Sequence, residues 1–203
     1  LPPYRFASFE VPGYPMYLSA VYLSLGQADL PLAVVQAVTE ILTVGVIGFL
    51  VCALGVEANA VLAAVGLWWA SPWFPSVAHA VGTEVIAVPL SGLLLALVIL
   101  ASRSQRWSLW LGAGFLCGLN VLTRPDSYVA GVVLPAVALS RARSARHGLR
   151  LATIYALGVL SLVSPWMFHL RQKTGRFELP GWAQFTQDET PWRRWTRFWI
   201  DDF

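Results

Sequence analysis

The sequence predicts an all-α protein that crosses a membrane repeatedly, with about five to six transmembrane helices and additional interfacial helices. Of its 203 residues, 57% are hydrophobic and 12% are charged, whereas a soluble domain carries about 25% charged residues. The apolar residues gather in runs, and about 20 of them in a helix span a bilayer. Most basic side chains in the middle of the chain fall in short breaks between these runs. This combination excludes a disordered chain and argues against a soluble enzyme.

Residues 1–30 form the first segment, which we expect at the extracytoplasmic membrane surface. From Pro12 to Leu25 the segment is expected to form an amphipathic interfacial helix, a depth that suits its tyrosines. The first membrane helix is expected over 31–56, because proline suits the first turn of a helix and Glu40 is the only charge in the run. A second apolar helix over 60–76 contains tryptophans near its end, as in an interfacial aromatic belt.

The later helices are separated by charged or proline-containing breaks. The helix that begins at Trp107 contains Gly114 and Gly118, a GxxxG spacing that permits close packing against another helix. The helix after Asp126 is too short to cross a bilayer straight. We expect these four helices over 84–101, 107–122, 127–140 and 149–169. Together with the earlier ones they form a bundle over 31–169, followed by a tryptophan-rich extracytoplasmic tail over 170–203.

The distribution of arginine predicts which loops face the cytoplasm. The breaks at 103–106 and 141–150 are rich in arginine, and the positive-inside rule places such loops in the cytoplasm. Alternation of the helices then places the other polar breaks, at 76–84 and 123–127, on the extracytoplasmic side with both terminal segments. A nucleic-acid surface would instead present its basic residues on a folded face, so no nucleic-acid partner is predicted.

Arg124 and Asp126 are the sharpest candidate site on the extracytoplasmic side. A charge at membrane depth is costly and is usually functional. Arginine binds phosphate oxygens through two parallel hydrogen bonds, so Arg124 is a candidate for a lipid-linked phosphate. The alternative is a structural Arg–Asp pair that caps two broken helices.

Other polar residues expected on this side are also candidates for substrate binding. Glu84 begins a helix, where it serves either as a cap or as a ligand. His79 is close enough in sequence to share a divalent metal ion with Glu84, although two ligands are weak support for a metal site. Tyr14, Arg171 and Lys173 complete the candidate set, the last two as groups that would hold a phosphate on the outer face.

Six short segments along the chain form a series of motifs. They are Pro12-Gly13-Tyr14-Pro15-Met16-Tyr17, Thr83-Glu84, the run from Gly114 to Pro125, Ser164-Pro165-Trp166, His169-Leu170-Arg171 and Gly175-Arg176-Phe177. In order and spacing, over about residues 10–180, they resemble bacterial dolichyl-phosphate-mannose mannosyltransferase-like proteins. These belong to the C-type glycosyltransferase superfamily, which includes protein O-mannosyltransferases and the lipid A aminoarabinose transferase. The segment that ends in Leu-Thr-Arg-Pro is the most specific of the motifs.

The resemblance implies a partial C-type bundle that transfers a sugar, with inversion, from a polyprenyl phosphate to an extracytoplasmic acceptor. It also implies a bacterial inner-membrane location and contact with membrane lipids. In the family an acidic residue after the first membrane helix is the catalytic base, and we expect its equivalent upstream of Leu1. The alternatives are a non-catalytic scaffold subunit held by other membrane subunits, which the missing base favours, and a transporter, for which no internal repeat is visible.

Overall fold

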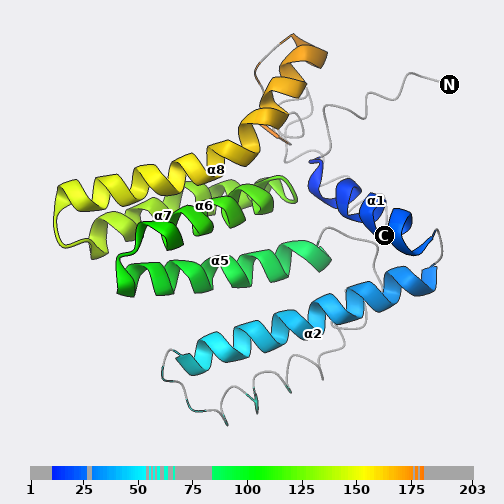
Figure 1. Cartoon of the computed structure of the whole chain (residues 1–203), viewed down its shortest axis with the longest axis horizontal. Helices are drawn as coiled ribbons and strands as arrows, with labels where there is room; N and C mark the ends of the chain where they lie inside the picture. The colour runs from blue at the N-terminus through cyan, green and yellow to red at the C-terminus, as the bar shows by residue number, and fades with distance from the viewer. Residues whose placement is uncertain are drawn as a thin grey trace, which may run out of the picture.

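The structure is a computed structural model that describes residues 11–26, 29–53 and 84–175, together with residues 55, 57, 59, 62, 63, 66, 177, 179 and 180. All the regular elements in this part of the chain are helices (Figure 1). They are α1 (Gly13–Leu25), α2 (Asp29–Ala53), α5 (Glu84–Ser104), α6 (Trp107–Val121), the 3₁₀ helix η2 (Pro125–Ser127), α7 (Tyr128–Arg141) and α8 (Ala145–Thr174).

The predicted all-α membrane fold is confirmed. Two helices, Val85–Ser104 and Ala145–Lys173, are long and apolar enough to cross a membrane, and a third span results if α1 and α2 count as one bent pair. Helix α6 has 15 residues, which gives a length of about 22 Å. That is shorter than the bilayer core of about 30 Å. The helix expected over 60–76 lies mostly outside the described residues.

The core lies where α6 packs between α5 and α8, with α7 against α8. Trp110 of α6 and Tyr155 of α8 are fully buried there, with ring centroids 6.3 Å apart in an edge-on arrangement. The Tyr155 hydroxyl donates to the backbone oxygen of Ala130, 3.3 Å away in α7. One aromatic pair therefore ties three helices together.

The predicted GxxxG contact is present between α6 and α8. A Cβ on Gly114 would collide with the backbone oxygen of Tyr155, and a Cβ on Gly118 would lie 3.0 Å from the backbone oxygen of Val159. Gly158 is the matching small residue on α8, since its Cβ would lie 2.9 Å from the Gly114 Cα. The two backbones approach closely because none of these three residues has a side chain.

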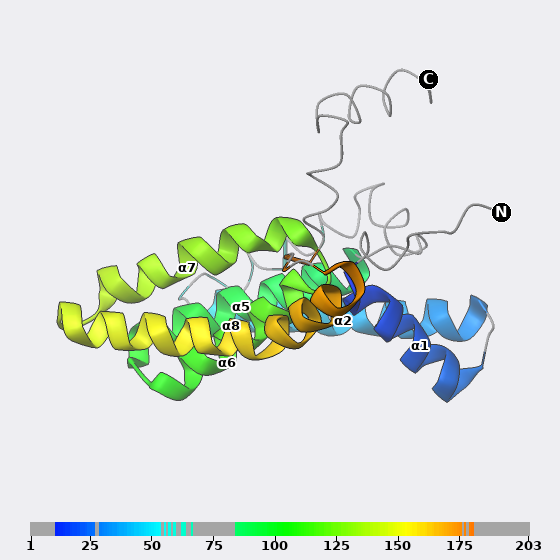
Figure 2. The same ribbon diagram turned by 90° about the horizontal axis from the view of Figure 1, so that it is seen from above.

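The described parts of the two predicted groups of loops lie at opposite ends of the bundle. At one end, the Gln105 side chain donates to the backbone oxygen of Arg141, 3.3 Å away, which joins the two arginine-rich loops. At the other end, the backbone N–H of Gly13 donates to the backbone oxygen of Leu122, 2.7 Å away. Figure 2 shows α1 and the last turns of α8 at this second end.

Two expectations about the helices were wrong. The last helix was expected to stop near 169, but α8 has 30 residues, contains Pro165 and continues to Thr174. It bends in its C-terminal part (Figure 1), because proline removes one backbone hydrogen bond and kinks a helix without ending it. Helix α1 is also less amphipathic than expected, because apolar side chains lie on both of its sides. Met16 and Leu23 are on the exposed side, and Tyr14 and Val21 are on the buried side.

Candidate functional site

The backbone between α6 and α7 sets Arg124 at a break between two helices. Helix α6 ends at Val121. The backbone N–H groups of Thr123 and Arg124 both donate to the backbone oxygen of Asn120, at 3.0 and 2.8 Å. Arg124 then takes an extended conformation, with φ −141° and ψ 124°. The residue before a proline avoids the helical conformation, so Pro125 explains why the chain turns here.

Arg124 and Asp126 form a bidentate ion pair across this turn. The Arg124 Nε lies 3.2 Å from Asp126 Oδ1, and its Nη2 lies 3.1 Å from Asp126 Oδ2. The two side chains are 37% and 63% exposed, and exposed pairs contribute little to stability. The main effect of the pair is therefore to fix the direction of the guanidinium.

The start of α1 docks onto this same turn. A Cβ on Gly13 would lie 2.7 Å from the Leu122 oxygen and 3.0 Å from the Thr123 Cα, so only glycine fits without movement of backbone. The next residue, Tyr14, is 9% exposed and stacks on Tyr17 with ring centroids 6.2 Å apart. Two sequence motifs more than a hundred positions apart thus meet at the Arg124 turn.

A buried polar pair lies directly behind the turn. The Asn120 Nδ2 donates to the Ser91 hydroxyl, 2.7 Å away in α5. Asn120 is 2% exposed, and its Oδ1 is buried with no hydrogen-bond partner within the described part of the chain. The Asn120 side chain therefore links α5 to the end of α6, directly before the Arg124 turn.

The basic residues at the end of α8 lie at the same end of the bundle (Figures 1 and 2). The Arg171 guanidinium carbon lies 4.3 Å from the centre of the Phe177 ring, a cation–π contact. Lys173 is exposed in the last turn. The segment after the helix is tied back to α7, since the Tyr128 hydroxyl donates to the Pro180 oxygen, 2.9 Å away.

The remaining predicted site residues are less fully described. Glu84 is the first residue of α5, at the same end of the bundle, because Ser91 of that helix contacts Asn120. His79 lies outside the described residues. Within the residues that the structure describes, no three His, Cys, Asp or Glu side chains gather as a metal site. The expected base upstream of Leu1 stays a prediction.

The family comparison matches residues 10–169 to the model described as dolichyl-phosphate-mannose-protein mannosyltransferase. The chain belongs to this family. The match covers the docking residue Gly13, the Arg124 turn and α8 beyond its internal proline. No curated protein and no solved structure matches the chain.

As a member of the dolichyl-phosphate-mannose-protein mannosyltransferase family, the chain is an integral membrane protein of a membrane glycosyltransferase class. The predicted resemblance is therefore confirmed. Sequence reasoning missed the roles of Gly13 and Asn120 at the Arg124 turn. The available signal was their presence inside the two motifs that resemble the family, which gave no indication that the motifs touch.

Proposed function

We propose that this chain holds the phosphate of a polyprenyl-phosphate sugar donor at the Arg124 turn, for transfer of the sugar to an acceptor hydroxyl on the extracytoplasmic side. One observation carries the proposal: the guanidinium of Arg124 projects from a break between two helices, braced by Asp126 through two contacts of 3.1 and 3.2 Å. The family membership supports glycosyl transfer as the reaction class.

The chemistry of the donor explains why an arginine is needed. When the bond between the sugar and the phosphate oxygen breaks, negative charge develops on the leaving phosphate. A fixed guanidinium stabilises that charge and holds two phosphate oxygens at once. Because the phosphate is a stable anion, it needs little protonation to leave. Arg124 supplies the positive charge, and Asp126 positions it.

The second requirement is a carboxylate that deprotonates the acceptor hydroxyl. The resemblance puts that group upstream of Leu1, so the proposal assigns the described residues to the donor side of the reaction. Tyr14 follows Gly13, which donates to the Leu122 oxygen, and would contribute to the donor site from the start of α1. Arg171 and Lys173 add positive charge at the same end of the bundle and would help hold the donor phosphate there.

The arrangement of charge along the bundle supports the extracytoplasmic side. The two arginine-rich loops meet at the end opposite the Arg124 turn, as the contact between Gln105 and Arg141 shows. If the positive-inside rule orients this protein, the Arg124 turn faces away from the cytoplasm. A polyprenyl chain would lie in the bilayer, with its phosphate at the depth of this turn.

The test is sugar transfer by the full-length gene product in membrane vesicles, with a radiolabelled polyprenyl-phosphate mannose as donor. Arg124→Ala is expected to abolish use of the donor while insertion and expression stay normal. Arg143→Ala is the matched control, since Arg143 is exposed at the opposite end, and it is expected to keep full activity. Normal transfer by Arg124→Ala contradicts the phosphate role. An inactive wild type that stays bound to other membrane subunits supports the scaffold alternative.

A further inference from the structure

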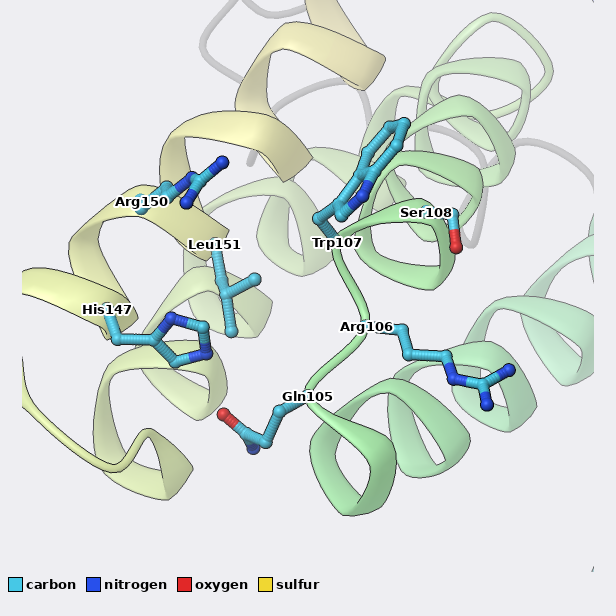
Figure 3. A pocket seen from close by; sticks show the side chains of 7 residues that line it. All are labelled: Gln105, Arg106, Trp107, Ser108, His147, Arg150 and Leu151. Atoms are coloured by element: carbon cyan, nitrogen blue, oxygen red, sulfur yellow. The ribbon is translucent and has the colours of Figure 1, made fainter.

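A cavity of about 230 Å³ lies at the end of the bundle opposite the Arg124 turn. It opens between the start of α8 and the connection from α5 to α6 (Figure 3). This volume is below the range of about 300–1,000 Å³ that encloses a drug-sized ligand, so it suits a small polar group. The lining residues are Gln105, Arg106, Trp107, Ser108, His147, Arg150 and Leu151.

The walls of the cavity differ in character. His147, Arg150 and Leu151 come from α8, and Figure 3 shows the Arg150 guanidinium directed toward the Trp107 side of the cavity. The Arg106 side chain points away from α8 (Figure 3), so its backbone forms the wall there. One side of the cavity is thus cationic, and the indole of Trp107 with the Leu151 side chain makes the rest apolar.

Gln105, in the connection between α5 and α6, lines the cavity and has an unusual backbone conformation. Its φ of 57° lies in the left-handed region, and its Nε2 donates to the backbone oxygens of Ser102 and Arg141, at 2.6 and 3.3 Å. The Oε1 of the same amide is buried without a hydrogen-bond partner within the described residues, and Gln105 lines the cavity. The two Nε2 hydrogen bonds fix the position of the connection between α5 and α6, which forms this wall of the cavity.

The electrostatics of the cavity favour an anion. Helices α6 and α8 both begin here, and neither has an acidic residue in its first turn. The N-terminus of a helix carries a partial positive charge, yet the first turns of α8 bring Arg146 and Arg150, and the residue before α6 is Arg106. None of the lining residues is a carboxylate. A bound anion would offset this concentration of positive charge.

The depth of the cavity identifies the source of the anion. The candidate span Val85–Ser104 ends beside the cavity, and the span Ala145–Lys173 begins beside it. Trp107 at its mouth is 57% exposed, and tryptophan is enriched at the level of lipid headgroups. The cavity therefore lies at the boundary between hydrocarbon and water, whichever side of the membrane it faces.

We infer that this cavity binds the phosphodiester headgroup of an anionic phospholipid. Arg150 and His147 donate to the phosphate oxygens. The indole of Trp107 and the Leu151 side chain cover the adjoining glycerol ester. Basic pockets between membrane helices bind anionic headgroups elsewhere in the same way. This site is distinct from the Arg124 turn and does not depend on the proposed donor role.

The experiment is native mass spectrometry of delipidated protein titrated with phosphatidylglycerol or phosphatidylcholine. Phosphatidylglycerol is expected to bind more tightly. One arginine near an anionic surface is worth about 1 kcal/mol, so Arg150→Gln is expected to weaken phosphatidylglycerol binding about fivefold. Arg150→Lys is expected to retain most of it, which separates a lost charge from a misfolded protein. The matched control Arg143→Gln removes an exposed charge from the adjacent loop.

Three results overturn the inference. If Arg150→Gln and Arg143→Gln weaken phosphatidylglycerol binding equally, the lipid responds to the overall charge of the protein and not to the cavity. Equal binding of phosphatidylcholine removes the role of the anion. Displacement of the lipid by inorganic phosphate at millimolar concentration identifies free phosphate, and not a headgroup, as the ligand.

Discussion

Replacement of Gly13 by alanine is the most informative single change at the docking of α1 on the Arg124 turn. The added Cβ would lie 2.7 Å from the Leu122 oxygen and 3.0 Å from both the Leu122 carbon and the Thr123 Cα. All three are backbone atoms, so no side-chain rotation relieves the contact. The start of α1 must move away from the turn that carries Arg124.

The size of the effect follows from two losses. Overpacking of a tight contact costs about 1–3 kcal/mol. Separation of the two segments also breaks the 2.7 Å hydrogen bond from the Gly13 N–H to the Leu122 oxygen, which adds about 1 kcal/mol. The expected destabilisation is about 2–4 kcal/mol, and each kcal/mol lowers the midpoint of thermal unfolding by about 2–4 °C in a chain of this size.

The assay is thermal unfolding in detergent, followed by intrinsic tryptophan fluorescence, together with sugar transfer in vesicles. Gly45→Ala in α2 is the matched control, because a Cβ there would have nothing within 4 Å and alanine favours the helix by about 1 kcal/mol. Gly13→Ala is expected to lower both the unfolding midpoint and the transfer rate. A Gly13→Ala protein as stable and active as Gly45→Ala would refute the docking of α1 on the turn.

Three further changes test the packing. Gly114→Ala is expected to lower the midpoint of thermal unfolding, because the added Cβ would collide with the backbone of α8. Gly112→Ala is expected to leave the midpoint unchanged or raise it, because its Cβ would lie 3.7 Å from a flexible leucine methyl group. Equal midpoints for the two variants would contradict the close α6–α8 contact. In denaturant unfolding, the free energy of unfolding of Gln105→Gly is expected to exceed that of Gln105→Ala by about 1 kcal/mol, because an L-residue is strained at φ 57°. A more stable Gln105→Ala protein would contradict that backbone conformation. Tyr128→Phe removes the 2.9 Å bond to Pro180 and is expected to speed limited proteolysis after α8; an unchanged cleavage rate argues against that tie.

The positions of the helices were predictable from sequence, because the apolar runs and the breaks between them largely determine where each helix begins and ends. The breaks at Arg103 and Asp126 are visible as charges between hydrophobic stretches, and α5, α6 and α7 begin and end close to them. Pro165 misled the prediction, since a proline inside a long apolar run kinks the helix and here does not end it. Propensity near one proline carries no information about the packing that keeps α8 continuous.

The site was predictable only in part, for a physical reason. The cost of burying charge singled out Arg124 and Asp126, and charge asymmetry predicted which loops share an end of the bundle. The contact of Gly13 with Leu122 joins segments far apart in the sequence, and no local pattern encodes such a pairing. The same holds for the cavity beside Arg150, which forms only when the α5–α6 connection meets α8.

The measurement that tests the account most directly is photo-crosslinking with a polyprenyl phosphate that carries a diazirine next to the phosphate, followed by mapping of the labelled peptides. The account predicts labels on the peptide that contains the turn from Leu122 to Tyr128, and their loss in Arg124→Ala. Labels concentrated instead on the residues around Trp107 and Arg150, unchanged in Arg124→Ala, would contradict it, because the donor phosphate would then lie at the opposite end of the bundle.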